Sequence, residues 1–138
     1  MRPALPQNET RVAIGSDIDI VYARQKGRDL ATRLGFSSSD GALIATAISE
    51  MARNVVLYAR RGEIVLRPIE RGGRRGIHIV AQDRGPGIRD LNLAMQDGYS
   101  TSGGLGVGLP GVRRLMDEFE IVSKNGEGTR VTVKKWLR

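Results

Sequence analysis

The spacing of hydrophobic residues predicts two helices in the first half of the chain. In the first, apolar positions run from Ile20 to Leu34 behind a possible Ser16-Asp17 cap, and Gly35 is expected to end the helix. A serine cluster at 37–39 offers a cap for the second helix. The apolar stripe of that helix is spaced by four, three, four and three residues and consists of Ile44, Ile48, Met51, Val55 and Tyr58. This spacing predicts a helix with one continuous buried face.

Alternation of apolar and polar residues predicts strands around these helices. A short strand is expected at 11–15, after a loose tail at 1–10 that has no periodicity. Two further strands, at 63–69 and 76–82, are expected to form a hairpin around the Arg/Gly turn at 71–75.

The second half of the chain begins with a glycine-rich region that contains a short helical segment near 90–96. We expect a helix at 110–119, with Pro110 in its first turn and Phe119 facing inward, and then strands at 120–123 and 129–136. This order of elements predicts an α/β fold, a two-layer sandwich in which helices pack on one face of a mixed, mostly antiparallel sheet.

The composition limits the possible functions. A chain of 138 residues is expected to form one domain, at 11–138. It has no cysteine and a single histidine, so any metal is expected to bind oxygen ligands. We find neither a signal peptide nor a run of roughly 18 apolar residues, which favours a cytoplasmic protein without a membrane partner.

The net charge of +7 raises the possibility of a nucleic-acid surface. The basic residues are dispersed along the chain, however, and aromatic residues make up only 4% of it, too few for a base-stacking platform. We therefore expect solvated basic faces, and we consider a nucleic-acid partner unlikely.

Two polar residues on the second predicted helix could perform chemistry. At 100° per residue, Glu50 and Asn54 lie roughly 40° apart on one flank of the apolar stripe. A carboxylate can accept a proton from an attacking hydroxyl, and an amide oxygen can bind Mg²⁺, so the pair suits phosphoryl transfer. An ordinary pair of polar residues on a helix shoulder is the alternative. Arg53 could orient a partner, bind a phosphate or simply be solvated.

A second motif, Asp83-Arg84-Gly85-Pro86-Gly87, directly follows a predicted strand. The Asp83 carboxylate could accept a hydrogen bond from the exocyclic amine of adenine, whereas guanine presents an oxygen at that position. The glycines would let the backbone approach a base closely. A tight turn that begins with aspartate explains the motif equally well.

A third motif is a glycine loop that leads into the helix at 110–119. Backbone N–H groups at the start of a helix form an anion site that suits polyphosphate. The loop residues assigned to this site are Ser100, Thr101, Gly104, Leu105, Gly106, Val107 and Gly108. A dinucleotide fingerprint is rejected because no apolar strand precedes the loop, and no Gly-Lys-Ser/Thr sequence supports a P-loop.

Together, the order and spacing of these motifs resemble the GHKL ATPase family, which includes gyrase B, histidine kinases and MutL. Within that family, residues 11–138 resemble the RsbT-type serine/threonine protein kinases of bacterial stressosomes. The closer match lies in the stretches 47–54, 97–106 and 108–119, which read AISEMARN, DGYSTSGGLG and GLPGVRRLMDEF.

The resemblance implies a Bergerat fold that binds ATP and Mg²⁺. It implies that Glu50 is the general base, that Asn54 is the Mg²⁺ ligand, and that Asp83 and Gly87, with Gly85 between them, lie at the adenine. It further places 104–108 at the phosphates and Thr129 on the adenine side.

The resemblance also implies partners. The substrates would be serine or threonine residues of STAS-domain stressosome proteins, and the released kinase would activate a PP2C-type phosphatase. The alternative function is a nucleotide-regulated sequestering module, similar to the related anti-sigma factors, with little kinase activity.

Overall fold

The computed structural model describes residues 9–87, 95 and 108–138. The predicted helical segment near 90–96 therefore lies almost wholly outside the described residues. The elements follow one another in the order β1 (Thr10–Ile14), α1 (Asp17–Leu34), α2 (Ser38–Ala59), β2 (Gly62–Arg71), β3 (Arg74–Asp83), α4 (Gly108–Leu115), β4 (Glu118–Lys124) and β5 (Gly128–Trp136).

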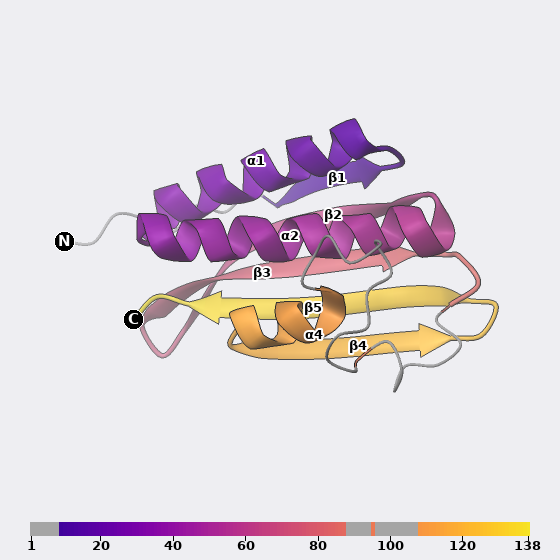
Figure 1. Cartoon of the computed structure of the whole chain (residues 1–138). Helices are drawn as coiled ribbons and strands as arrows, with labels where there is room; N and C mark the ends of the chain where they lie inside the picture. Colours follow the sequence, from indigo (N-terminus) through magenta and orange to yellow (C-terminus); the bar gives the residue numbers. More distant parts are fainter. Residues whose placement is uncertain (1–8, 88–94, 96–107) are drawn as a thin grey trace.

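The five strands form one sheet in the order β1-β2-β3-β5-β4, and the helices lie on one face of it (Figure 1). The two-layer α/β sandwich is therefore confirmed. The expected mixed sheet is corrected in detail, because all four described strand pairings are antiparallel. The last strand, β5, lies between β3 and β4 and so joins the two halves of the sheet.

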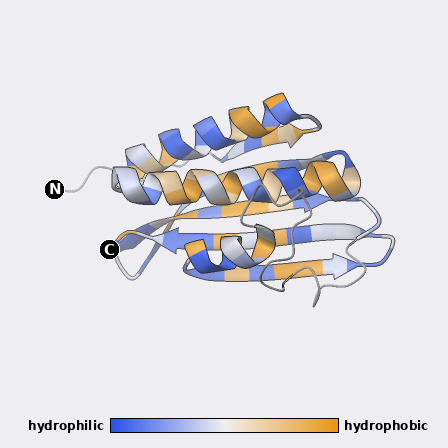
Figure 2. Ribbon diagram, viewed as in Figure 1, coloured by the Kyte–Doolittle hydropathy of each residue, from blue (hydrophilic) through white to orange (hydrophobic). Residues whose placement is uncertain are grey.

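The core lies between the sheet and the helices. Alternate residues of each central strand face the helices, so Ile64 and Leu66 of β2 and Ile77 and Ile79 of β3 are fully buried. The α2 stripe packs against them through Ile44, Ile48 and Met51, which are also fully buried. Figure 2 shows α2 as mainly apolar, whereas α1 alternates apolar and hydrophilic positions.

Both long helices begin and end close to their predicted residues. Gly35 ends α1 in the left-handed region, with φ of 98°. The α2 cap is Ser37, whose hydroxyl accepts the Asp40 N–H at 3.1 Å. Ser16 occupies the cap position of α1 but its side chain accepts no backbone N–H there. Instead, Asp19 accepts the Gly15 N–H at 2.9 Å.

The predicted helix at 110–119 is wrong at both ends. The helix begins at Gly108 and ends at Leu115, and Phe119 belongs to β4, where it pairs with Val133 of β5. Pairing with β5 outweighs the helical spacing of the local sequence, because tertiary contacts override weak local preferences. The hairpin is longer than predicted, because its strands pair as far as Arg71 and Arg74. Only Gly72 and Gly73 form the turn, with φ values of 58° and 77°.

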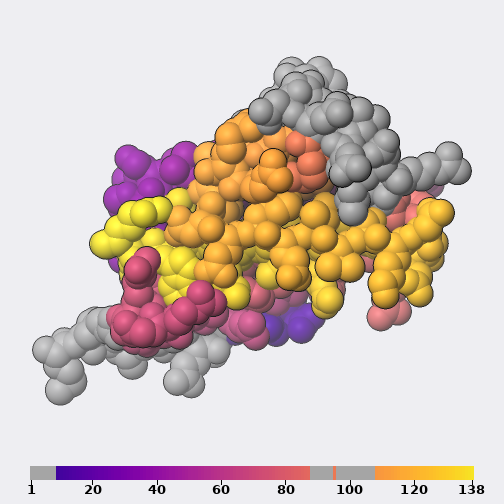
Figure 3. All heavy atoms as spheres, turned by 90° about the horizontal axis from the view of Figure 1, so that it is seen from below, coloured from indigo at the N-terminus to yellow at the C-terminus, as the bar shows by residue number. Residues whose placement is uncertain are grey.

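The end of β5 lies beside the turn of the β2–β3 hairpin. Trp136 is buried, donates its ring N–H to Glu118 at 2.7 Å and lies under the Arg71 guanidinium. This N–H bond, helped by the positive charges of Arg71 and Lys134, holds the pKa of Glu118 below its usual value. Figure 3 looks onto the β4 edge, where α4 and β4 form much of the surface.

One helix departs from an expectation based on the sequence. By length and composition alone, α2 (Ser38–Ala59) is apolar enough to cross a membrane, contrary to the prediction that no such segment exists. In the structure, 56% of its apolar window is buried within the protein, as is usual for the core helix of a folded domain.

Candidate active site

Asp83 lies at the last position of β3 and holds the following loop. Its Oδ1 atom accepts the Gly85 N–H at 2.9 Å and the Thr129 N–H at 3.3 Å. The first bond is the local turn that the sequence allowed as an alternative. The second joins two residues that are 46 positions apart, which a local turn does not explain.

Thr129 reaches Asp83 because β5 pairs with β3. The register places Gln82 opposite Arg130. Because the strands are antiparallel, Asp83 follows Gln82 and Thr129 precedes Arg130 at the same end of the sheet. Thr129 is buried, and its hydroxyl shares a 2.8 Å hydrogen bond with Ser123 of β4. The end of the sheet thus holds a carboxylate and a hydroxyl side by side.

These two residues border a narrow cavity of about 10 Å³ between α2, the sheet and the start of α4. Its walls are mainly apolar, with a few polar groups from Asn54, Tyr58, Asp83 and Thr129. The other lining residues are Met51, Val55, Ala81, Leu109 and Val131. Apolar walls with a few polar groups are typical of sites for flat aromatic ligands, although a base could enter here only after the walls move apart.

A wider hollow of about 680 Å³ lies on the other side of Asp83 and Thr129. It is open to solvent, and charged side chains such as Arg61, Arg84 and Arg130 line it. Charged, solvated walls suit a base less well than the apolar walls of the smaller cavity on the helix side of the sheet.

Glu50 is buried on the α2 flank, and both of its carboxylate oxygens have partners. Oε1 accepts a charge-assisted hydrogen bond from Arg53 at 2.7 Å, and Oε2 accepts the backbone N–H of Gly108 at 3.3 Å. The second contact connects α2 to the first residue of α4. Arg53, which the sequence left undecided, is therefore the ion-pair partner of Glu50.

Asn54 lies one helical turn after Glu50 and lines the same cavity as Asp83. Among the described residues, no group of three or more histidine, cysteine, aspartate or glutamate side chains could hold a metal ion. A single amide ligand fits Mg²⁺ that is held mainly by the phosphates of a bound nucleotide. The residues at this site are compatible with that arrangement.

Gly85 and Gly87 are needed by the protein's own packing. A Cβ atom on Gly85 would lie 2.5 Å from the Ala59 Cβ, and one on Gly87 would lie 2.5 Å from the Lys124 carbonyl oxygen. Gly87 also has φ of 83°. The loop is thus pressed against α2 on one side and against the end of β4 on the other, which keeps it beside Asp83.

Part of the predicted phosphate site cannot be placed. Ser100, Thr101, Gly104, Leu105, Gly106 and Val107 lie outside the described residues. Gly108 is described, and it begins α4 with φ of 65°. This residue therefore places the start of α4 next to Glu50.

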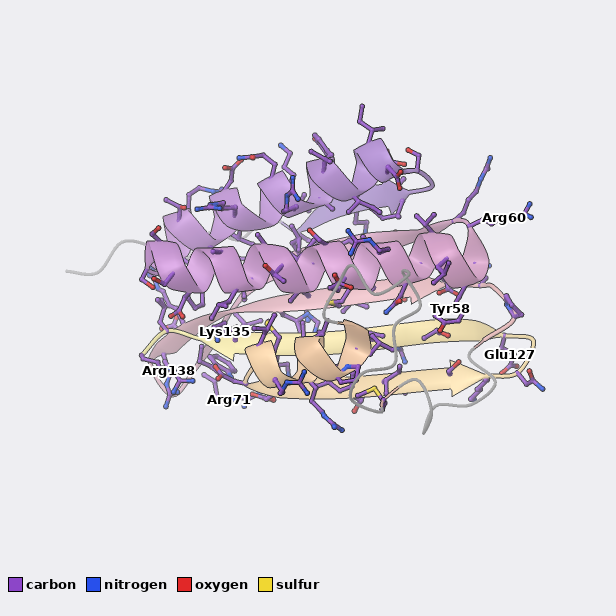
Figure 4. The ribbon with its side chains drawn as sticks, viewed as in Figure 1. Tyr58, Arg60, Arg71, Glu127, Lys135 and Arg138 are labelled. Carbon is purple, nitrogen blue, oxygen red and sulfur yellow. The ribbon has the colours of Figure 1, made fainter. Side chains whose placement is uncertain are left out.

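Tyr58 is a site residue that the sequence reasoning missed. The apolar spacing assigned it to the core stripe, but it is only half-buried and lines both the small cavity and an outer hollow beside Pro86 and Gly87 (Figure 4). Its position one turn after Asn54 on the same flank could have identified it.

Comparisons with known proteins identify the family and the fold. Residues 17–135 match the family model of the histidine kinase-like ATPase domain. The serine/threonine-protein kinase RsbT of Bacillus subtilis is 53% identical over 131 residues, which cover 95% of this chain and 98% of that protein. An anti-sigma F factor of Thermoanaerobacter is 30% identical over 122 residues, which cover 84% of each chain.

A solved structure supports the fold independently. The crystal structure of the RsbU and RsbW domains of a Mycobacterium tuberculosis protein superposes with a TM-score of 0.65 at 21% identity. The match covers 94% of this chain and 32% of that one. At this identity, the likeness concerns the fold alone.

Proposed function

This chain belongs to the histidine kinase-like ATPase domain family, and within it to the RsbT-type serine/threonine-protein kinases, and from this membership we propose how it works. It is a serine/threonine kinase that uses ATP and acts in stress signalling. We propose that residues 11–138 form its single catalytic domain and that the site between α2, α4 and the sheet binds the nucleotide.

One observation carries the proposed mechanism. Asn54, Asp83 and Thr129 come from three separate elements and line one small cavity, and the buried carboxylate of Glu50 lies beside it at the start of α4. A pair of polar residues that served only solubility would not be expected to meet an aspartate and a threonine from the end of the sheet.

In this mechanism, Asp83 recognises adenine. Its Oδ1 atom is engaged by two backbone N–H groups, which fix the orientation of the carboxylate. A carboxylate is an acceptor only, so it matches the exocyclic amine of adenine and repels the corresponding oxygen of guanine. Thr129, beside it, supplies a hydroxyl on the same side of the base.

Glu50 is the proposed general base. A substrate serine or threonine hydroxyl gives its proton to the Glu50 carboxylate while its oxygen attacks the γ-phosphorus of ATP. The bond from that phosphorus to the β–γ bridging oxygen breaks, and its electrons leave with ADP. Because Arg53 and Gly108 bind one oxygen each, the carboxylate is held in one orientation before substrate arrives.

Asn54 is the proposed Mg²⁺ ligand from the protein. When bound, the ion neutralises charge on the phosphates of ATP. The chain's own contribution is an uncharged amide oxygen, placed one turn after Glu50 and at the border of the adenine cavity.

The proposed substrates are serine or threonine residues of STAS-domain stressosome proteins. We further propose that the released kinase activates a PP2C-type phosphatase and that it works in the cytoplasm. The 53% identity to a kinase, against 30% to an anti-sigma factor, favours transfer over pure sequestration.

A transfer assay distinguishes the two functions. Purified protein is incubated with γ-labelled ATP, Mg²⁺ and a purified STAS-domain stressosome protein, and the label is located by mass spectrometry. We expect label on a serine or threonine of the partner. Stable binding of partner and nucleotide without any label transfer would support the sequestering module instead.

A further inference from the structure

Helix α4 is bound by a charged side chain at each end. At its start, the Gly108 N–H donates to the Glu50 carboxylate at 3.3 Å. At its end, the Leu115 carbonyl oxygen accepts a hydrogen bond from the Lys135 ammonium at 2.9 Å. The first N–H groups and last carbonyls of a helix have no partners within the helix, and the two charges match the sign of the helix dipole.

Lys135 stands where an apolar residue would be expected. It follows Val131 and Val133 on the face of β5 that the helices cover, and it is only 6% exposed. Burying an ammonium group is unfavourable unless it is hydrogen-bonded. Figure 4 shows Lys135 on β5 near the C-terminal end of α4. The hydrogen bond to the Leu115 carbonyl therefore stabilises the buried Lys135 ammonium group.

The residues that follow α4 are held by the same part of β5. The Asp117 N–H donates to the Lys134 carbonyl at 2.9 Å, and the Trp136 N–H donates to the Asp117 carboxylate at 2.8 Å. Lys135, between these two, holds the helix itself. The end of β5 thus holds both the last residue of α4 and the chain that leads from α4 into β4.

We propose that Lys135 is a positioning residue of the nucleotide site, because it fixes α4 so that its N-terminus faces the ATP phosphates. The helix has eight residues, so it is about 12 Å long. Its apolar contacts through Leu109 and Val112 are non-directional, whereas a hydrogen bond to the last carbonyl fixes its position along its own axis. Lys135 therefore influences phosphate binding indirectly, by holding the C-terminal end of the helix whose N-terminus faces the phosphates.

This inference rests on the proposed placement of the phosphates at the start of α4. The adenine contacts come from Asp83 and Thr129, which Lys135 does not touch among the described contacts. A positioning role consequently predicts a defect in binding ATP but not in binding adenosine. General loosening of the fold would weaken both ligands.

The test compares three variants by calorimetric titration with ATP and with adenosine. Lys135→Met keeps the length of the side chain and removes the donor, and Lys135→Arg keeps a donor. Lys134→Met is the matched control, because this neighbour lies on the other face of β5. We expect Lys135→Met to lose about tenfold in ATP affinity and less than about twofold in adenosine affinity, as a small misplacement of binding groups can do. Lys135→Arg should recover most of the loss, and Lys134→Met should match the wild type.

Equal losses for ATP and adenosine in Lys135→Met, or no loss of ATP affinity, would overturn the inference while leaving the proposed function intact. If Lys135→Met does not fold, Lys135→Gln is judged by the same two affinities. A wild-type protein that bound neither ligand would contradict the proposed function and this inference together.

Discussion

The carboxylate of Glu50, on α2, accepts the backbone N–H of Gly108, the first residue of α4. The proposed base thus also satisfies one N–H group at the beginning of the helix that faces the phosphates. Removing the whole side chain would disturb both roles, so a substitution that separates them is needed.

Glu50→Gln should separate chemistry from structure. The amide oxygen can still accept the Gly108 N–H, although the Arg53 ion pair is lost, and the amide cannot take a proton from a substrate hydroxyl at neutral pH. We expect transfer to fall by roughly 10²- to 10⁴-fold, the usual contribution of a general base, with ATP affinity within a few-fold of wild type. Single-turnover phosphorylation beside calorimetric ATP titration measures both quantities.

Glu50→Ala serves as the comparison, because it also removes the contact with Gly108. Nucleotide binding should survive in this variant as well, since the adenine contacts come from other elements. Transfer at the wild-type rate in either variant would refute the assignment of the base.

Asp83→Asn should weaken the preference for adenine. Asparagine keeps an oxygen for the Gly85 and Thr129 N–H groups, so the loop is expected to stay folded. Its NH₂ group can turn toward the base, where it opposes the adenine amine and matches the guanine oxygen. We expect a sharp loss of ATP affinity and a smaller ratio of ATP to GTP affinity. An unchanged ratio, measured by competition titration, would remove Asp83 from base recognition.

Asn54→Ala should lower Mg²⁺-dependent transfer while the protein remains folded. The side chain is half-buried on the helix flank and does not belong to the apolar stripe of α2. Transfer is measured against Mg²⁺ concentration, and circular dichroism reports the fold. Unfolding at room temperature would instead make Asn54 a structural residue.

Gly85→Ala should destabilise the fold through a collision with α2. Its Cβ would lie 2.5 Å from the Ala59 Cβ and 2.8 Å from the Ala59 Cα, so backbone must move. Overpacking of this kind costs about 1–3 kcal/mol in the free energy of unfolding. Gly41→Ala is the control, since a Cβ there meets nothing within 4 Å. Denaturant titration should show a gain of about 0.4–1 kcal/mol for the control.

The single histidine should make stability depend on pH. Partial burial, followed by the positive charges of Arg67 and Lys134, lowers the pKa of His78 below its usual 6.5. The unfolded chain therefore takes up a proton first as the pH falls, and the free energy of unfolding should decline from about pH 6.5 down to the folded-state pKa. Arg67→Gln should raise that pKa, as NMR titration of the one imidazole can measure. A pKa above 6.5 in the wild type would contradict the argument.

The sequence predicted the long helices well because their signals are local. The apolar spacing of α2 and the glycine after α1 act within a few residues, and both are confirmed. The error at Phe119 has the opposite origin. That residue follows a helical pattern, and its β pairing with Val133 is visible only in three dimensions.

The candidate site was predicted partly from spacing and partly from family resemblance. Spacing alone placed Glu50 and Asn54 on one helix flank, but no pattern could bring Thr129 to Asp83, because that contact depends on the register of β3 with β5. Lys135 escaped notice because a lysine near the end of a strand is usually solvated. Its burial follows from the position of α4, which the sequence does not reveal.

The strand order has a consequence for how the protein is made. Because β5 separates β3 from β4, β4 has no other partner among the described strands until β5 has been synthesised. Strands β1 to β3 and the two long helices can associate while the chain is still emerging from the ribosome. The cavity wall that contains Thr129 and Val131 cannot form at that stage, because both residues belong to β5. A nascent chain should therefore acquire nucleotide binding in a single late step, after translation has passed residue 136.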